Sequence, residues 1–165
     1  MTLIPVERSA DRERWSLLYR DAFPRVYRAL VAALFDRDAA LDALQDAFEE
    51  GLRKPPDDDR NIEGWLYRVA VRKARRAWRR SARNVTLEFE PSSPDSADRT
   101  LDRLEIGRLL AMLTERQRTI LVAHYYLGLR HEEIADALSI RPGTVAATIN
   151  QGISKMRKER SHVPS

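Results

Sequence analysis

A polar segment near the middle of the chain separates two parts that can fold. Residues 84–100 read NVTLEFEPSSPDSADRT and contain two prolines, three serines and several acids. A segment of this composition buries too little apolar surface to offset the conformational entropy lost on ordering. We therefore expect a flexible acidic linker between two lobes of roughly 80 and 65 residues, each small enough that its own core is thin.

Both lobes carry the pattern of helices. Strand-like alternation is nearly absent, and Ala, Leu, Arg and Glu dominate. Pro24 either starts a new helix or kinks a long one, and Gly51, Pro55 and Pro56 are expected to end the second helix. Breaks are expected at Gly128, Ser139 and Gly143. The fold class is therefore all-α, with helices expected at 12–35, 38–52, 62–82, 101–113, 115–127, 131–138 and 143–158.

Several classes of protein are excluded by what the sequence lacks. The chain has no cysteine, which removes disulfides, thiolate metal sites and cysteine nucleophiles, and suits a reducing cytoplasm. No apolar run approaches the roughly 20 residues that span a bilayer, and the N-terminus has no apolar signal segment. The three histidines lack a His-x-x-x-His companion, and the pair Glu132 and Glu133 reads as solvated surface. We expect a cytoplasmic protein that is not an enzyme, with no cofactor, metal or membrane partner.

The charges of the chain are arranged in blocks of alternating sign. The net charge is only +4, but residues 36–63 hold ten acids against four bases, and residues 68–83 hold eight bases and no acid. Acids lead six to two over 86–105, and bases lead five to one over 141–160. Basic blocks favour phosphates, whereas acidic blocks favour a basic protein surface. Separate faces for separate partners are therefore expected.

The helix expected at 62–82 has one apolar face and one cationic face. At about 100° per residue, its apolar side chains fall on one arc. The bases on the other side are Arg68, Arg72, Lys73, Arg75, Arg76, Arg79, Arg80 and Arg83. Trp65 stands among them at the N-terminal end, where a ring beside arginines can stack an unpaired base, worth about 1–3 kcal/mol. We expect this face to bind nucleic acid. An anionic membrane, an acidic protein or plain solvated surface are the alternatives, and for Trp65 the alternative is packing at a lobe edge.

A helix-turn-helix pattern occupies the second lobe. A short helix at 131–138, a tight turn and a longer helix at 143–158 follow in order, with apolar residues spaced to lock the two together. Asn and Gln suit paired hydrogen bonds to adenine, and Thr or Ala can contact a thymine methyl. The side chains expected to face a major groove are Ala147, Thr148, Asn150, Gln151, Ser154, Lys155 and Lys158. Thr144, expected to cap the second helix, belongs to the same DNA-binding set. Phosphate contacts are expected from Arg141, Lys155, Arg157 and Lys158.

Three segments of the chain resemble a known family. The run LTERQRTILVAHYYLGLRHEEIADALSIRPGTV resembles region 4 of bacterial sigma factors, and also the DNA-binding domain of quorum-sensing and response-regulator proteins. In the first lobe, ALDALQDAFEEGL resembles the sigma region 2 segment that docks on the RNA polymerase clamp. IEGWLYRVAVRKARRAWRR resembles the adjoining segment that opens and reads the downstream promoter element. Together they resemble a sigma-70 superfamily factor of the extracytoplasmic-function (ECF) type.

This resemblance implies an architecture, partners and site residues. It implies a region 2-like domain at 10–83, the linker at 84–100 and a region 4-like domain at 101–160. The implied partners are promoter DNA, the clamp and flap of core RNA polymerase, and, as is common for such factors, an anti-sigma protein. Loop 55–63 matches the loop that captures a flipped non-template base. The docking residues it implies are Asp42, Gln45, Asp46 and Glu49, which are expected to be exposed, with Phe48 in the core.

The chain departs from the family pattern in three places, and two other functions stay open. Leu41 stands where the family often has Glu, and Arg72 and Arg76 stand where it commonly has Asn and Asp. The recognition helix, AATINQGISK, is poorer in arginine than usual. These differences suggest a divergent promoter or heavier reliance on phosphates. The alternatives are a conventional helix-turn-helix regulator that acts without polymerase, and a helical protein that binds membrane or RNA surfaces.

Overall fold

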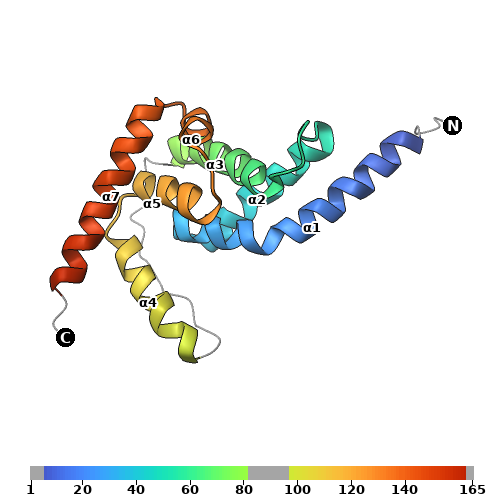
Figure 1. Cartoon of the computed structure of the whole chain (residues 1–165). Helices are drawn as coiled ribbons and strands as arrows, with labels where there is room; N and C mark the ends of the chain where they lie inside the picture. Colours follow the sequence, from blue (N-terminus) through green and yellow to red (C-terminus); the bar gives the residue numbers. More distant parts are fainter. Residues whose placement is uncertain (1–5, 82–96, 163–165) are drawn as a thin grey trace.

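Helices account for the regular secondary structure of the described chain. The computed structural model describes residues 6–81 and 97–162, and the side chains of residues 8–75 and 103–162. No strand occurs in these ranges, which confirms the expected all-α class. Most of the expected linker lies outside the described residues, and α4 begins before the expected linker ends. The elements are α1 (Val6–Leu34), α2 (Arg37–Arg53), α3 (Ile62–Ser81), α4 (Ala97–Ala111), α5 (Glu115–Leu121), the π-helical turn η1 (Val122–Tyr126), α6 (His131–Leu138) and α7 (Pro142–His162) (Figure 1).

The first three helices form a bundle. α1 is one helix with Pro24 inside it, so the second of the two expectations for this proline holds, and Figure 1 shows α1 changing direction along its length. A proline bends a helix because it lacks the N–H donor and its ring crowds the preceding turn. The buried side chains of this bundle include Val26, Leu30, Leu44 and Leu66, none of them measurably exposed. These buried side chains form a close-packed interior, and packing against it holds α2 and α3 in place.

Gly51 has a different role from the one expected. The helix α2 ends at Arg53, just before Pro55 and Pro56 as expected, but Gly51 lies inside it and does not end it. A Cβ atom at this position would lie 1.9 Å from Cζ2 of Trp15. The Trp15 ring is buried, and its Nε1 donates a hydrogen bond to the carbonyl oxygen of Phe48 at 3.0 Å. Gly51 is therefore needed for the close approach of α1 and α2 around this ring.

Replacing Gly51 with alanine tests this packing. The added methyl group must displace Trp15, and overpacking a core costs about 1–3 kcal/mol, which outweighs the roughly 1 kcal/mol that alanine adds as a helix former. We expect Gly51→Ala to lower the free energy of unfolding by about 1–2 kcal/mol in denaturant titration. Gly107→Ala is the matched control, because Gly107 is also helical and a Cβ there meets nothing within 4 Å. Equal effects of the two substitutions would contradict this role of Gly51.

The second lobe consists of α4, α5, η1, α6 and α7. Thr114 and Gln117 cap α5 reciprocally, each side chain bonding to the other's backbone N–H. A helix expected over 115–127 is instead α5 followed by a π-helical turn, and Gly128 ends it with φ +67°. Ser139 ends α6 in the left-handed region, with φ 54°. Gly143 was also expected to break the chain, but it lies in the first turn of α7.

The two lobes pack against each other and share one core. Buried apolar residues of both lobes form a continuous cluster, with α5 against α1 and α6 against α3. The Tyr67 hydroxyl on α3 donates to the carbonyl oxygen of Thr119 on α5 at 2.8 Å, in a fully buried setting. Arg118 donates to the carbonyl oxygen of Ala33 at 3.0 Å and lies 4.0 Å from the centre of the Phe35 ring. The expectation of two separate thin cores is corrected: lobes this small bury more apolar surface together than apart.

Glu115 is a poorly satisfied charge at this junction. Its Oε2 atom is buried and has no hydrogen-bond partner among the described residues. Burial raises the pKa of Glu115 to about 7, although nearby Arg118 acts in the opposite direction. Tyr67, across the junction on α3, has its own pKa raised by burial and by the charge of Glu115. The junction therefore favours the neutral form of this carboxyl group.

The stability of the chain should depend on pH through Glu115. Because its folded-state pKa lies above the ordinary value of 4.5, its contribution to stability is fully present below about pH 4.5 and is lost as the pH rises through about 7. We expect Glu115→Gln to raise the free energy of unfolding by about 1 kcal/mol at pH 8, a figure discounted because the side chain is partly exposed. At pH 5 the two proteins should differ much less. A difference that is the same at both pH values would contradict this assignment.

Candidate nucleic-acid and polymerase interfaces

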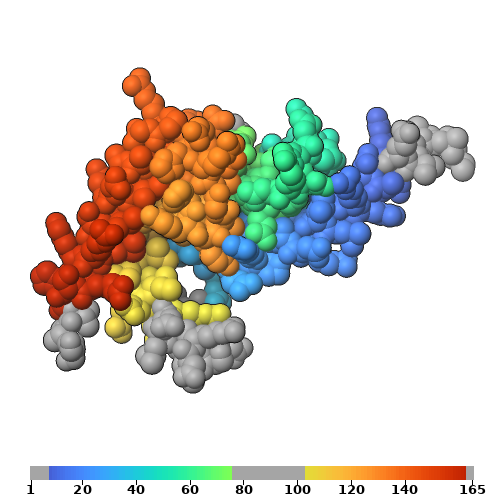
Figure 2. Space-filling view, viewed as in Figure 1, coloured from blue at the N-terminus to red at the C-terminus, as the bar shows by residue number. Residues whose placement is uncertain are grey.

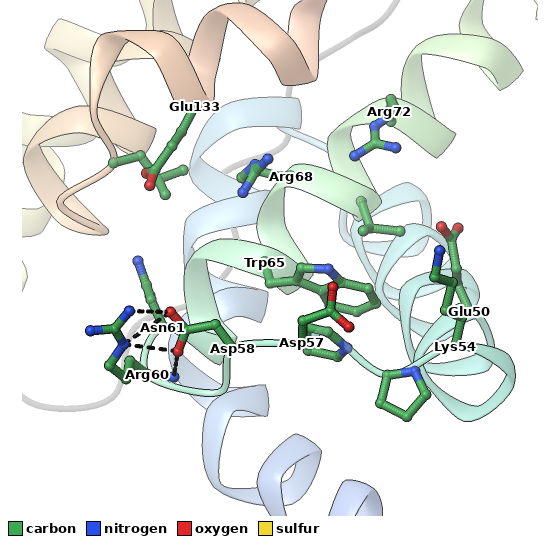
Figure 3. Close-up of a pocket in the computed structure, with 14 residues that line it drawn as sticks. Glu50, Lys54, Asp57, Asp58, Arg60, Asn61, Trp65, Arg68, Arg72 and Glu133 are labelled. Carbon is green, nitrogen blue, oxygen red and sulfur yellow. Dashed lines mark hydrogen bonds and ion pairs between the residues drawn. The ribbon is translucent and has the colours of Figure 1, made fainter.

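A cavity of about 440 Å³ lies where the loop between α2 and α3 meets the first turns of α3. It brings together the loop expected to capture a base, the expected stacking tryptophan and two of the expected basic residues. Figure 3 shows side chains from three helices and the loop around it. Its lining includes Glu50 of α2, Lys54 directly after α2, Asp57, Asp58, Arg60 and Asn61 of the loop, Trp65, Arg68 and Arg72 of α3, and Leu129 and Glu133 of the second lobe.

The loop that forms one wall of the cavity is held in shape by its own polar groups. Two guanidinium nitrogens of Arg60 donate to the carboxylate of Asp58, at 2.7–2.9 Å, and this bonding lowers the pKa of Asp58 to about 2. Asp59 pairs with Arg14 of α1. The Asn61 side-chain oxygen accepts a hydrogen bond from the backbone N–H of Gly64 at 2.9 Å and so caps α3. These bonds fix the conformation of the loop in the absence of a ligand.

Trp65 packs at the edge of the first lobe, which is one of the two interpretations of it from the sequence, and it also lines the cavity. It is half-buried and packs edge-on against Trp15, with ring centroids 5.4 Å apart. Trp15 in turn stacks on Phe48 of α2, with centroids 6.3 Å apart. The remaining surface of Trp65 lines the cavity. The ring is thus held in orientation by the core while part of its surface borders the cavity, and stacking on a base stays a prediction.

The basic face of α3 is narrower than the helical wheel indicates. Arg72 is exposed, and the Lys73 ammonium lies 3.3 Å from the carboxylate of Glu50. Arg75 donates from Nη1 to the carbonyl oxygen of Leu138 on α6 at 2.6 Å. Arg68 faces α6, and its buried Nε atom has no hydrogen-bond partner within the part of the chain that the structure describes. The wheel placed Arg68 and Arg75 in solvent, and this is corrected because the second lobe packs there. The side chains of Arg76, Arg79 and Arg80, and all of Arg83, lie outside the described residues.

The helix-turn-helix has the expected form, with two corrections to its outer face. Val145 and Ile149 are buried, and Arg141, Thr144, Ala147, Asn150, Gln151, Ser154, Lys155 and Lys158 are exposed. Thr148 is buried instead, and its hydroxyl donates to the carbonyl oxygen of Thr144 at 2.7 Å, so it does not face outward. Thr144 does not cap α7, which starts at Pro142 with the Arg141 carbonyl oxygen accepting the first bonds. Lys155 donates to the Gln117 side-chain oxygen at 3.2 Å.

The outer face of α2 is acidic and open. Asp42, Gln45, Asp46 and Glu49 are all exposed, as expected of docking residues, while Leu44 is buried and Phe48 is half-buried. The side-chain oxygen of Asp36 accepts a hydrogen bond from the Ala39 N–H at 3.0 Å and caps this helix. The exposed carboxylates are therefore presented on a helix that is anchored at its start by this cap and along its length by the core.

Two of the cavity-lining residues that were not expected from the sequence belong to the second lobe. They are Leu129 and Glu133, and Glu133 is half-buried rather than solvated surface. Its carboxylate accepts from the Arg130 backbone N–H at 3.2 Å and pairs with the Arg130 side chain at 3.0 Å. No local pattern could indicate that these residues reach a cavity of the first lobe, because that depends on how the lobes pack. No described group of three or more His, Asp or Glu side chains could hold a metal ion.

Comparison with known proteins gives this arrangement a family. Residues 18–84 match the family described as Sigma-70 region 2, and residues 103–156 match the family described as Sigma-70, region 4. RNA polymerase sigma-E factor of Streptomyces coelicolor is 31% identical over 145 residues, which are 85% of this chain and 80% of that protein. ECF RNA polymerase sigma factor SigL of Mycobacterium tuberculosis is 31% identical over 160 residues, 90% of each.

Solved structures share the fold. The sigma factor RpoE of Bartonella quintana, solved in complex with the anti-sigma factor NepR, superposes with a TM-score of 0.66 at 16% identity, covering 92% of this chain and 97% of that one. CnrH, solved in complex with the cytosolic domain of CnrY, gives a TM-score of 0.63 at 19% identity, covering 95% and 94%.

The chain belongs to the ECF group of the sigma-70 family of RNA polymerase sigma factors. Its function is therefore that of a non-enzymatic transcription initiation factor. The alternative of a conventional helix-turn-helix regulator does not account for the match of residues 18–84 to region 2. Within the described residues, no helix is both long and apolar enough to cross a membrane.

Proposed function

We propose that this sigma factor divides its work among three surfaces. The outer face of α2 docks on core RNA polymerase, the cavity and the adjoining part of α3 open and read the downstream promoter element, and α7 reads the upstream element. The observation that carries this proposal is the cavity, because it joins an ordered loop, a core-packed Trp65 and the exposed Arg72 beside the acidic helix α2. This division corresponds to functional segments at 10–83 and 101–160, joined by 84–100.

Docking on polymerase is assigned to exposed acidic groups. Asp42, Gln45, Asp46 and Glu49 share one solvent-facing side of α2 and suit a basic clamp surface. The helix is anchored behind this face by Leu44, so the carboxylates are held in a fixed pattern. We assign the polymerase flap to the second lobe, as the resemblance implies. An anti-sigma protein is a further proposed partner, because the solved RpoE structure is a complex with the anti-sigma factor NepR. The factor is proposed to act in the cytoplasm.

Strand opening is assigned to the cavity. Extruding a base costs a few kcal/mol, and stacking it on an aromatic ring can recover about 1–3 kcal/mol. Trp65 supplies the ring, and Arg72 supplies a cation for the strand that leads to it. Asn61 uses its oxygen in the cap of α3, which leaves its amide N–H groups to donate to a base edge.

Upstream reading is assigned to the exposed row of α7. Asn150 and Gln151 lie on this row and suit adenine in a major groove, while Ala147 is small enough to contact a thymine methyl. Lys158 and Arg141 lie where phosphates would pass. Because the two reading modules are linked, each gains from the effective concentration set by the other, so neither needs strong affinity alone.

Run-off transcription with core polymerase on a pool of genomic fragments tests the proposal. We expect discrete transcripts that require the full chain. Asp46→Arg reverses a proposed docking charge and should reduce both co-elution with core polymerase and transcript yield at least tenfold, whereas Asp21→Arg, an exposed position on α1 outside the proposed surfaces, should change neither. A conventional regulator would instead bind its DNA without core polymerase and yield no transcript dependent on the chain. Wild-type yield from Asp46→Arg would contradict the docking assignment.

The two DNA-reading surfaces should respond differently to substitution. Arg72→Ala removes a proposed phosphate contact, so it should weaken binding of the polymerase holoenzyme to all promoters and reduce the salt slope by about one. Gln151→Ala should instead change the preference among upstream elements, by roughly 1–3 kcal/mol at the affected base pair. The measurement is promoter affinity across a series of salt concentrations and upstream sequences. Uniform effects from both substitutions would contradict the division of labour.

A further inference from the structure

A second cavity, of about 510 Å³, lies between the first turns of α1 and the end of α2. The buried Trp15 lies at its base, and three arginines line it, Arg8, Arg12 and Arg53, so it is called the arginine cavity below. Every described residue that lines it belongs to the first lobe. Figure 2 shows the first turns of α1, in blue, at the opposite end of the molecule from α7, in red. The arginine cavity is therefore a feature of the first lobe alone.

The arginine cavity carries a positive charge, and its cations are open to a ligand. Among the described residues that line it, Asp11 is the one carboxylate against three guanidinium groups. All three arginines are exposed, and none of them forms an ion pair within the described ranges, whereas the nearby Arg14 pairs with Asp59. Exposed arginines without a carboxylate partner suit phosphate groups, which their planar donors can bind in pairs.

The arginine cavity adjoins the cavity that Trp65 lines, which is the Trp65 cavity. Pro55, at the start of the loop, lines both of them. Trp15, at the base of the arginine cavity, meets Trp65 edge-on, with ring centroids 5.4 Å apart. The ion pair of Arg14 with Asp59 connects the same part of α1 to the loop. A DNA strand with one base in the Trp65 cavity can therefore continue past Pro55 to the arginines.

The lining of the arginine cavity suits a sugar-phosphate backbone better than a base. Trp15 is only 3% exposed, so its ring offers no free face on which a base could stack. The described lining also has no Asn or Gln, the side chains that pair with adenine. On single strands, sequence preference comes mainly from stacking, whereas phosphate contacts carry no sequence information. Binding in this cavity should therefore add affinity without a preference for sequence.

We propose that the arginine cavity binds the backbone of the same DNA strand whose extruded base enters the Trp65 cavity. Its ligands are the phosphates of the nucleotides next to that base. This inference rests on the proposed function, because it takes strand opening at the Trp65 cavity as given. A strand that is held by these arginines cannot pair again with its complement, so the contact stabilises the opened promoter without reading it.

Two arginine substitutions and a matched control test the inference. Arg12→Gln and Arg53→Gln each remove one cation from the arginine cavity, the first on α1 and the second on α2. Arg20→Gln makes the same change of charge at an exposed position of α1 that lines neither cavity. Each full-length chain is assembled with core polymerase, and DNA binding by the holoenzyme is measured by fluorescence anisotropy.

The probe is a fluorescein-labelled single-stranded DNA that carries the downstream element of a promoter recovered by run-off transcription. It is compared with probes that have about four further nucleotides at one end or the other, roughly the shortest length that a single-strand groove covers. For the wild-type chain, we expect extension at one end to raise the affinity about tenfold, whatever the added sequence, and to steepen its salt dependence.

Arg12→Gln and Arg53→Gln should each reduce this gain to about threefold and leave the affinity for the unextended probe unchanged, whereas Arg20→Gln should keep the full gain. The inference would be overturned, and the proposed function left intact, by the absence of any gain, by a gain that both substitutions leave in place or that Arg20→Gln reduces equally, or by a gain that depends on the added sequence. Failure of the wild-type holoenzyme to bind the unextended probe would overturn the proposed use of the Trp65 cavity, and the inference with it.

Discussion

The packing of α3 on two of its sides is the constraint on which the rest of the structure depends. Leu66 and Ala70 are completely buried in the bundle with α1 and α2, while Tyr67 bonds to α5 and Arg75 bonds to α6. A helix has a limited circumference, so contacts on two sides leave only a strip for any other partner. Arg72 lies on that strip, next to the cavity. The same helix thus holds the two lobes together and carries the residues proposed to open DNA.

A line of aromatic rings connects the proposed docking helix with the cavity. Phe48 of α2 stacks on Trp15 of α1, and Trp15 meets Trp65 of α3 edge-on. Gly51 is what lets Trp15 lie this close to α2. Rings packed in this way position one another tightly, because the interior of a protein has little free volume. Binding of polymerase to the outer face of α2 would therefore present the cavity at a defined distance from the polymerase, through a shared core rather than through a loop.

The sequence was a good guide to what depends on local patterns and a poor guide to what depends on the meeting of the lobes. Periodicity located the helices and the helix-turn-helix, and the exposure of Asp42, Gln45 and Asp46 followed from it. The helical wheel predicted that Thr148 faces outward, but its side chain is buried and its hydroxyl bonds to the backbone of its own helix. Arg75 and Glu133 could not be placed at all from local patterns, because each contacts or lines a surface built from the other lobe. The composition of residues 84–100 predicted a linker, but composition cannot predict whether the two lobes that a linker joins pack against each other.

In the free factor the two lobes share one core, and Leu129 and Glu133 of the second lobe line the cavity assigned to strand opening. The central claim of this account is that this cavity binds promoter DNA, which requires the lobes to part on assembly. The chain has no cysteine, so a donor and an acceptor dye can be attached at two introduced cysteines, Arg20→Cys on α1 and Glu159→Cys on α7, both exposed positions outside the proposed surfaces. The most direct measurement is energy transfer between these dyes in the free chain and after assembly with core polymerase and promoter DNA. The account predicts high transfer in the free chain and a clear fall on assembly. The same transfer efficiency before and after assembly would contradict it.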